Sequence, residues 1–196
     1  MPPLAACLQR ADRVVEEPLG GIGAAVGQHA ELIAAHLRHA RPADSAFVPY
    51  LRFGEALLTQ LQLDPELREL AILLVAARTG AEYEWFQHVG IARAIGVDDE
   101  RISAVEGGEL DAPCFDSDAR VMLRFASEVL DGPRAEEETF TALSERFPAR
   151  EIVELLLVIG SYQMLARAMT TLDIDIDEAV GGAVLQRRPR RTRDPS

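Results

Sequence analysis

Apolar positions along the chain recur at helical spacing, and the breaks between them carry helix-capping residues. Residues 64–66 supply a capping Asp, a Pro at the first helical position and an acid in the first turn, and Gly80 follows the end of that segment. No stretch shows the two-residue alternation typical of strands. The sequence therefore predicts an all-α fold, with helices at residues 24–40, 49–61, 65–79, 81–95, 98–107, 116–130, 139–147 and 148–170.

Two of the expected helices, at residues 70–77 and 152–159, are apolar nearly all round. Such helices are buried on more than one side, and in a small chain the excess apolar surface often lies in a subunit interface. We therefore expect a homo-oligomer. No run of 18 or more apolar residues is present, so we expect no membrane-spanning segment.

Composition narrows the class of protein. The first residues lack the basic start and apolar stretch of a secretory signal, and Cys7 and Cys114 form no CxxC pair. We therefore expect a cytoplasmic protein with neither a disulfide scaffold nor a structural zinc site. The chain contains no Lys, which excludes Schiff-base chemistry, a lysine-held pyridoxal cofactor and a phosphate-binding P-loop.

Charge is unevenly distributed along the chain. The formal net charge is -12, yet residues 187–194 carry five Arg and one Asp, so the body is strongly acidic and nucleic-acid binding by it is not expected. The Arg-rich tail is either a solvated end or a contact for an acidic surface or nucleic acid. The Gly-rich residues 20–27 favour a flexible entry into the first helix over a dinucleotide site, because no βαβ pattern surrounds them.

Candidate chemistry is concentrated in residues 80–88, GAEYEWFQH, directly after the apolar run at 70–77. Glu84 and His88 are four residues apart and share a helix face, and Glu69 lies near the start of the preceding helix. Two carboxyls and an imidazole in a partly dry site could transfer protons near neutral pH. The alternative is an ordinary helix pair. A metal site is not expected, because neither HExxH nor ExxH spacing is present.

Several of these segments together resemble a known family. Residues 67–73 and 82–88, with 92–96 and 151–164, are similar to the carboxymuconolactone decarboxylase family, whose superfamily includes the alkylhydroperoxidase D proteins. The resemblance covers about residues 45–178. It implies an alkylhydroperoxidase D-like helical domain there, after an N-terminal helical arm at 1–44 and before a flexible Arg-rich tail at 179–196, and it implies trimeric or hexameric assembly.

The peroxidase branch of this superfamily follows the pattern E-x11-C-x2-C-x3-H. On this chain the Glu falls on Glu69 and the His on His88, whereas the two thiol positions are Ala81 and Glu84. Thiol peroxidase chemistry needs a nucleophilic and a resolving thiol, so the register disfavours peroxidase activity.

The remaining resemblance is to the decarboxylase branch, which uses no metal or organic cofactor. It implies a lyase or isomerase that transfers a proton on a small acidic or aromatic-derived substrate. We expect His88 to carry the proton, Glu84 to orient it, and Glu69 to act as a second acid or relay.

Substrate contacts are expected from Tyr83, Trp85 and Arg68, and Arg78 and Arg93 are further candidates for an anionic substrate. Trp85 could equally pack in the core. The alternative function is a non-catalytic oligomeric protein that binds a small molecule on the same fold, since one fold hosts many functions.

Overall fold

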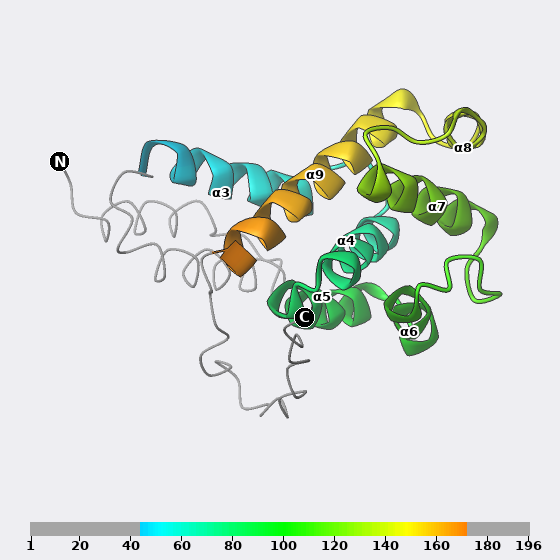
Figure 1. The fold of residues 1–196 in the computed structure, drawn as a ribbon, viewed down its shortest axis with the longest axis horizontal. Helices are drawn as coiled ribbons and strands as arrows, with labels where there is room; N and C mark the ends of the chain where they lie inside the picture. The colour runs from blue at the N-terminus through cyan, green and yellow to red at the C-terminus, as the bar shows by residue number, and fades with distance from the viewer. Residues whose placement is uncertain (1–43, 172–196) are drawn as a thin grey trace, which may run out of the picture.

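The computed structural model describes residues 44–171, and this part of the chain is entirely helical (Figure 1). The described helices are α3 (Asp44–Thr59), α4 (Pro65–Thr79), α5 (Glu82–Ile95), α6 (Asp99–Gly107), α7 (Ser117–Asp131), α8 (Glu137–Ser144) and α9 (Ala149–Thr171). The predicted all-α fold is confirmed. The expected helix at 24–40, the Gly-rich residues 20–27, Cys7 and the Arg-rich tail lie outside the described residues.

Capping residues set the helix ends where the sequence predicts them. The Asp64 side chain accepts hydrogen bonds from the backbone N–H groups of Glu66 and Leu67 at the start of α4. Gly80 ends α4 at φ 67°, and Gly96 ends α5 at φ 112°, left-handed conformations that glycine adopts without a side-chain clash.

The predicted start of α3 at residue 49 is wrong. The helix begins at Asp44, and Pro49 lies inside it. Pro49 is the sixth residue of α3, beyond the first four N–H groups that have no intrahelical partner, so it removes one intrahelical hydrogen bond, and the helix continues through it.

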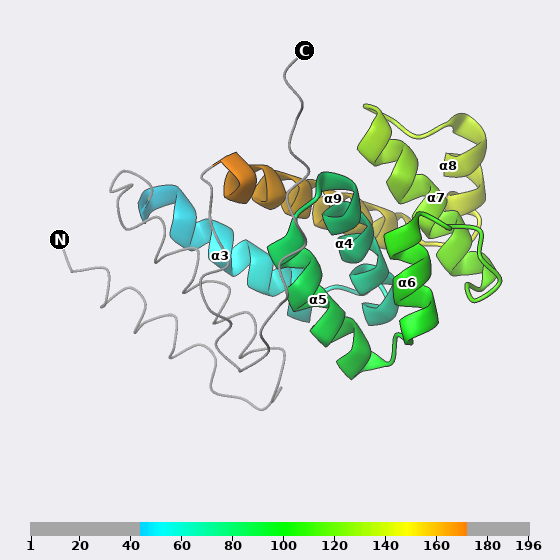
Figure 2. The same cartoon turned by 60° about the horizontal axis from the view of Figure 1, so that its bottom comes forward.

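Helix α4 lies at the centre of the fold, and Figures 1 and 2 both show it between α5 and α9. Helices α6 and α7 also pack on it, and residues 70–76 are at most 3% exposed. The expectation that its apolar run has surface left over for a subunit interface is therefore wrong. Neighbouring helices of the same chain already cover every side of it.

Helix α9, in contrast, keeps apolar side chains at the surface. Its buried face packs on α3, α4, α7 and α8, whereas Val153, Leu156, Leu157 and Met164 are 40–54% exposed. Its length and composition would allow it to cross a membrane, but 56% of its most apolar window is buried in the protein, as in a core helix. We call these four residues the exposed α9 face. An exposed apolar patch often marks a protein interface, so the expected homo-oligomer would form through this face.

We predict that Leu157→Glu lowers the oligomer mass, because the added carboxylate would be desolvated in a subunit contact. Sedimentation equilibrium or light scattering at micromolar concentration measures this. Ser103→Glu adds the same charge at an exposed position of α6 and should leave the mass unchanged. A wild-type protein that is monomeric in this range would contradict the expected assembly.

Glu154 on α9 fixes the segment that leads into α4. Its Oε2 accepts hydrogen bonds from the backbone N–H groups of Gln62 at 2.7 Å and Leu63 at 2.8 Å, and its Oε1 accepts one from Arg150 Nε at 2.8 Å. Burial would raise the pKa of Glu154, but the hydrogen bonds from Arg150, Leu63 and Gln62 outweigh burial and lower it.

We predict that Glu154→Gln lowers the free energy of unfolding by about 1.5–3 kcal/mol at pH 7, as for hydrogen bonds to a charged group. Because the pKa of Glu154 in the folded state lies below the ordinary glutamate value of 4.5, this stabilisation is present above pH 4.5 and is lost as pH falls through the folded-state pKa. Urea unfolding of both proteins at pH 7 and near pH 3 should therefore show the difference shrinking in acid. An equal difference at both pH values would contradict a charge-dependent role.

Candidate functional site

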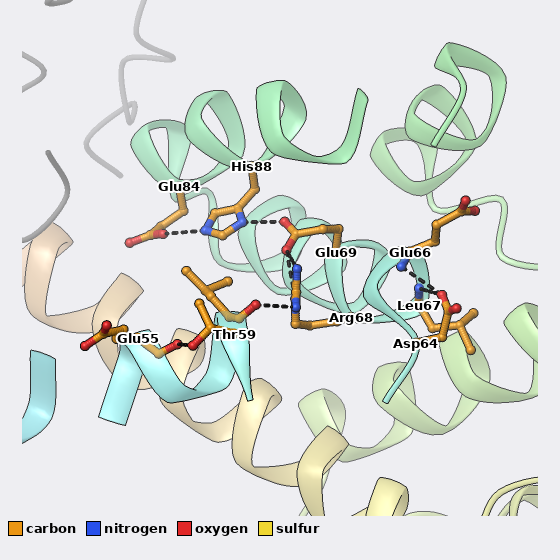
Figure 3. Close-up of polar contacts among 10 residues, drawn as sticks. Glu55, Thr59, Asp64, Glu66, Leu67, Arg68, Glu69, Glu84 and His88 are labelled. Carbon is orange, nitrogen blue, oxygen red and sulfur yellow. Dashed lines mark hydrogen bonds and ion pairs between the residues drawn. The ribbon is translucent and has the colours of Figure 1, made fainter. Parts of the chain in front are cut away.

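Four polar or charged side chains lie buried where α4 meets α5. Arg68 and Glu69 come from the first turns of α4, and Glu84 and His88 from the first turns of α5. Their exposed fractions are 4%, 0%, 1% and 2%, respectively. Figure 3 shows them in a row, with His88 between Glu84 and Glu69 and Arg68 beyond Glu69. Ionisable groups are rarely buried unless they are paired, so this buried row is the candidate site.

Arg68 holds one side of the Glu69 carboxylate. Its Nε and Nη2 both lie 3.0 Å from Glu69 Oε1, and its Nη1 donates a hydrogen bond of 2.7 Å to the backbone carbonyl of Leu58. Arg68 was predicted to contact substrate, but these contacts direct its guanidinium to Glu69 and to the end of α3. It positions the carboxylate.

The other oxygen of that carboxylate contacts the imidazole. Glu69 Oε2 lies 2.7 Å from His88 Nδ1, and His88 Nε2 lies 3.8 Å from Glu84 Oε2. An ionised carboxylate can only accept a hydrogen bond, so the tautomer that fits this contact carries its hydrogen on Nδ1 and presents the Nε2 lone pair on the side of Glu84. The sequence pattern predicts that Glu84 orients His88. In the structure Glu69 makes the orienting hydrogen bond, and the separation from Glu84 is too long for one.

This arrangement suits proton transfer. A proton taken up at Nε2 would create an imidazolium between two carboxyl groups, and such a cation is stabilised by both. In residues 44–171, no group of three or more His, Cys, Asp and Glu side chains could hold a metal ion. His88 and Glu69, 2.7 Å apart, form an acid–base pair.

The three tyrosines of the chain surround the Glu84 end of the site. Tyr83 precedes Glu84 on α5, Tyr50 comes from α3 and Tyr162 from α9. Burial raises the pKa of Tyr83 to about 12, and the Glu84 charge adds to this effect. Tyr50 lies 3.4 Å from both the carbonyl oxygen and Oγ of Ser161. Burial raises the pKa of Tyr50. The hydrogen bond with Ser161 lowers this pKa by less, and the Glu84 charge adds to the rise.

Tyr162 makes the closest aromatic contact with the site. Its ring stands at 86° to the His88 ring with the centroids 4.9 Å apart. Burial, and then the charges of Glu69 and Glu84, raise the pKa of Tyr162 well above its usual value, while Arg68 opposes them. All three phenols therefore stay neutral across the pH range in which proteins are usually studied.

The structure brings most of the predicted site residues together. Tyr83 is buried beside Glu84, whereas Trp85 is half-buried and packs against the core, as the alternative interpretation held. Arg78 and Arg93 do not reach the site, because they form surface ion pairs with Asp131 and Asp99.

Tyr50, Ser161 and Tyr162 do not appear among the residues predicted from the sequence. The sequence pattern could have predicted the burial of Tyr162, because Tyr162 lies seven residues after Leu155 and therefore on the same buried face of α9. A polar-tipped ring at such a position indicates a partner inside the protein.

Solved structures share this fold. A protein of unknown function from Agrobacterium tumefaciens, described as a candidate antioxidant defence protein AhpD, has a TM-score of 0.65 at 18% identity, covering 74% of this chain and 99% of that one. The alkylhydroperoxidase AhpD core of Ralstonia eutropha JMP134, an uncharacterized peroxidase-related protein, has a TM-score of 0.63 at 19% identity, covering 83% and 92%. The debrominase Bmp8, as a cysteine-to-alanine variant in complex with 2,3,4-tribromopyrrole, has a TM-score of 0.62 at 17% identity, covering 72% and 75%. No curated protein matches the chain.

The family comparison agrees with the fold. Residues 47–128 match the model of the carboxymuconolactone decarboxylase family, and this stretch includes both helices that carry the buried row. The chain is therefore similar to the carboxymuconolactone decarboxylase family over residues 47–128, and it shares the fold of the alkylhydroperoxidase D-like structures. The resemblance read from the sequence is thus confirmed.

The candidate site lies partly inside and partly outside the residues that the family model matches. Tyr50, Arg68, Glu69, Glu84 and His88 all lie inside residues 47–128. Tyr162, on α9, lies beyond the match, so the ring that packs on His88 comes from the part of the domain that the family model does not cover.

Proposed function

We propose that the chain is a cofactor-free lyase or isomerase of the carboxymuconolactone decarboxylase type, which transfers a proton on a small acidic or aromatic-derived substrate. The observation that carries this proposal is the 2.7 Å contact between Glu69 and His88 Nδ1, which leaves Nε2 as the exchanging atom. Arg68 holds Glu69 from the other side, so the orientation of the imidazole is supported by a second layer of contacts.

The proposed step balances without an oxidant or a metal. In an isomerisation, Nε2 takes a proton from a carbon next to a carbonyl, and the electron pair of the broken C–H bond passes into an enolate. The imidazolium then returns the proton to another carbon of the same system. In a decarboxylation, Nε2 first takes a proton from water; the C–C bond to the carboxylate then breaks, CO₂ leaves with the electron pair remaining on carbon, and the imidazolium gives its proton to that carbon. Glu69 stabilises the imidazolium in both cases.

Two observations favour this chemistry over thiol peroxidase activity. The thiol positions of the peroxidase pattern are Ala81 and Glu84, and both side chains are buried at the start of α5. Cys114, the other cysteine besides Cys7, lies between α6 and α7, away from the buried row in sequence and element. The complex of Bmp8 with a brominated pyrrole supports an aromatic-derived substrate, since that protein shares the fold.

Deuterium incorporation tests the proposal even when the products have not been identified. The wild-type protein is incubated in D₂O with a panel of lactone acids and hydroxylated or heteroaromatic compounds, and mass spectrometry measures C–H exchange and loss of CO₂. We expect exchange or decarboxylation with at least one class, retained in Cys7→Ser and Cys114→Ser and lost in His88→Ala.

Binding without exchange or decarboxylation across the panel would instead support the alternative of a non-catalytic small-molecule-binding protein. Turnover of an organic hydroperoxide that disappears in Cys114→Ser would overturn the argument from the thiol positions.

A further inference from the structure

The imidazole of His88 has a degree of freedom that its two carboxyl neighbours do not fix. The χ2 torsion of histidine is broad, so the ring can turn about its Cβ–Cγ bond at little cost. Glu69 contacts Nδ1 at 2.7 Å, and Glu84 lies 3.8 Å from Nε2. Only the first of these contacts is a hydrogen bond, so on the polar side the ring torsion is restrained at a single point, which permits small tilts about the Nδ1–Glu69 contact.

Tyr162 lies where it would oppose this rotation. The two ring planes are perpendicular, at 86°, with a centroid separation of 4.9 Å, which is the favoured edge-to-face arrangement of aromatic rings. A turn of the imidazole that changes the angle between the two ring planes would lose this favoured arrangement. Tyr162 is itself only 8% exposed, and its helix packs on α4 along the core, so its ring has little room to yield.

We propose that Tyr162 is a positioning residue of the site, which holds the His88 imidazole in the plane where Nδ1 meets Glu69 and Nε2 faces Glu84. This inference rests on the proposed function for its catalytic consequence, but its structural content does not require turnover. Three helices then hold the ring: α5 carries it, α4 supplies the hydrogen bond through Glu69, and α9 supplies the ring contact. The contact is between the two rings, so the hydroxyl group of Tyr162 is not required for the contact.

NMR of the ¹⁵N-labelled imidazoles measures the ring state directly. The chain has four histidines, and the His88 signals are those that disappear in His88→Ala. In the wild type we expect the tautomer with hydrogen on Nδ1. Tyr162→Phe keeps the ring and should preserve this signature, whereas Tyr162→Leu removes the ring and should give averaged or mixed tautomer signals.

Leu155→Ala is the matched control for loss of core packing. Leu155 is 1% exposed and lies seven residues before Tyr162 on the same face of α9, so its truncation destabilises the same helix without removing the ring contact. We expect lower stability in both Leu155→Ala and Tyr162→Leu, but a changed His88 signature only in Tyr162→Leu. An unchanged signature in Tyr162→Leu, or hydrogen on Nε2 in the wild type, would overturn the proposal.

Measurements of turnover in the same variants distinguish a failure of this inference from a failure of the proposed function. With a substrate from the deuterium panel, Tyr162→Leu should lower turnover about 10²-fold, as a displaced catalytic group does, and Tyr162→Phe should restore it. If the wild type exchanges no substrate, the proposed function fails while the NMR result still decides the role of Tyr162. If Tyr162→Leu alters the NMR signature and leaves turnover intact, the ring is held but its position does not limit the reaction, and the catalytic part of the proposal is overturned.

Discussion

Replacing His88 by alanine is expected to lower turnover by about 10²–10⁴-fold, or roughly 3–5 kcal/mol of activation free energy, because general acid–base catalysis contributes that much. The ring lies 2.7 Å from Glu69 through Nδ1, and no other imidazole is present among the described residues. Steady-state rates on the substrate identified by deuterium exchange measure the effect. The fold should persist, since the surrounding core is formed by other helices.

A buried histidine that only fills space would give a different result. Ile91→Ala is the control, because Ile91 is a buried residue of the same helix whose truncation costs about 2–5 kcal/mol of stability. For Ile91→Ala we expect a lower melting temperature with turnover per folded molecule preserved. If His88→Ala behaves in the same way, with stability lost and turnover retained, His88 is a core residue and the proposed chemistry has lost its proton carrier.

The helix ends could be predicted from the sequence because they depend on local chemistry. Asp64, Asp98 and Asp116 each accept hydrogen bonds from the first turn of the helix that follows, and such capping needs only residues within three positions. Pro49 misled the prediction for α3, because proline is favoured at the first helical position and disfavoured inside a helix, whereas here it is the sixth residue.

The members of the buried row were predictable, but their roles were not. Spacing places Glu84 and His88 on one helix face, and the resemblance adds Glu69 in register. Which carboxyl reaches the imidazole depends on how α4 packs on α5, and a contact between residues 19 positions apart is invisible to helical spacing. The ring of Tyr162 is further still along the chain and reaches the site only through the packing of α9.

Helix α4 shows a second property that depends on tertiary packing, namely which surface covers its apolar side chains. Its apolar run indicates burial correctly, yet a sequence pattern does not say which surface does the burying. Residues 70–76 are covered by helices of the same chain, whereas α9, with a similar pattern, leaves Leu157 and three other apolar side chains exposed. An apolar pattern therefore predicts burial, but it does not tell which neighbouring surface covers the helix.

Replacing Glu69 by glutamine is expected to lower the free energy of unfolding by about 3–5 kcal/mol, because the buried Arg68 guanidinium would lose its carboxylate. Arg68 is 4% exposed and keeps only neutral acceptors in that variant, the Leu58 carbonyl and the new amide oxygen, so its charge is no longer compensated. The amide is nearly the same size as the carboxyl, so the loss reports charge and hydrogen bonding rather than volume. Urea unfolding at neutral pH measures it.

Glu66→Gln supplies the matched control on the same helix. Glu66 also pairs with an arginine, Arg101 at 2.8 Å, but its side chain is 39% exposed, and exposed ion pairs contribute about 0–1 kcal/mol. Adding Arg68→Met to Glu69→Gln should recover part of the stability, because the uncompensated charge is then removed and the apolar stem is kept. A Glu69→Gln variant no less stable than Glu66→Gln would mean that water reaches Arg68. The buried row would then not be the dry, preorganised acid–base site on which the proposed reaction depends.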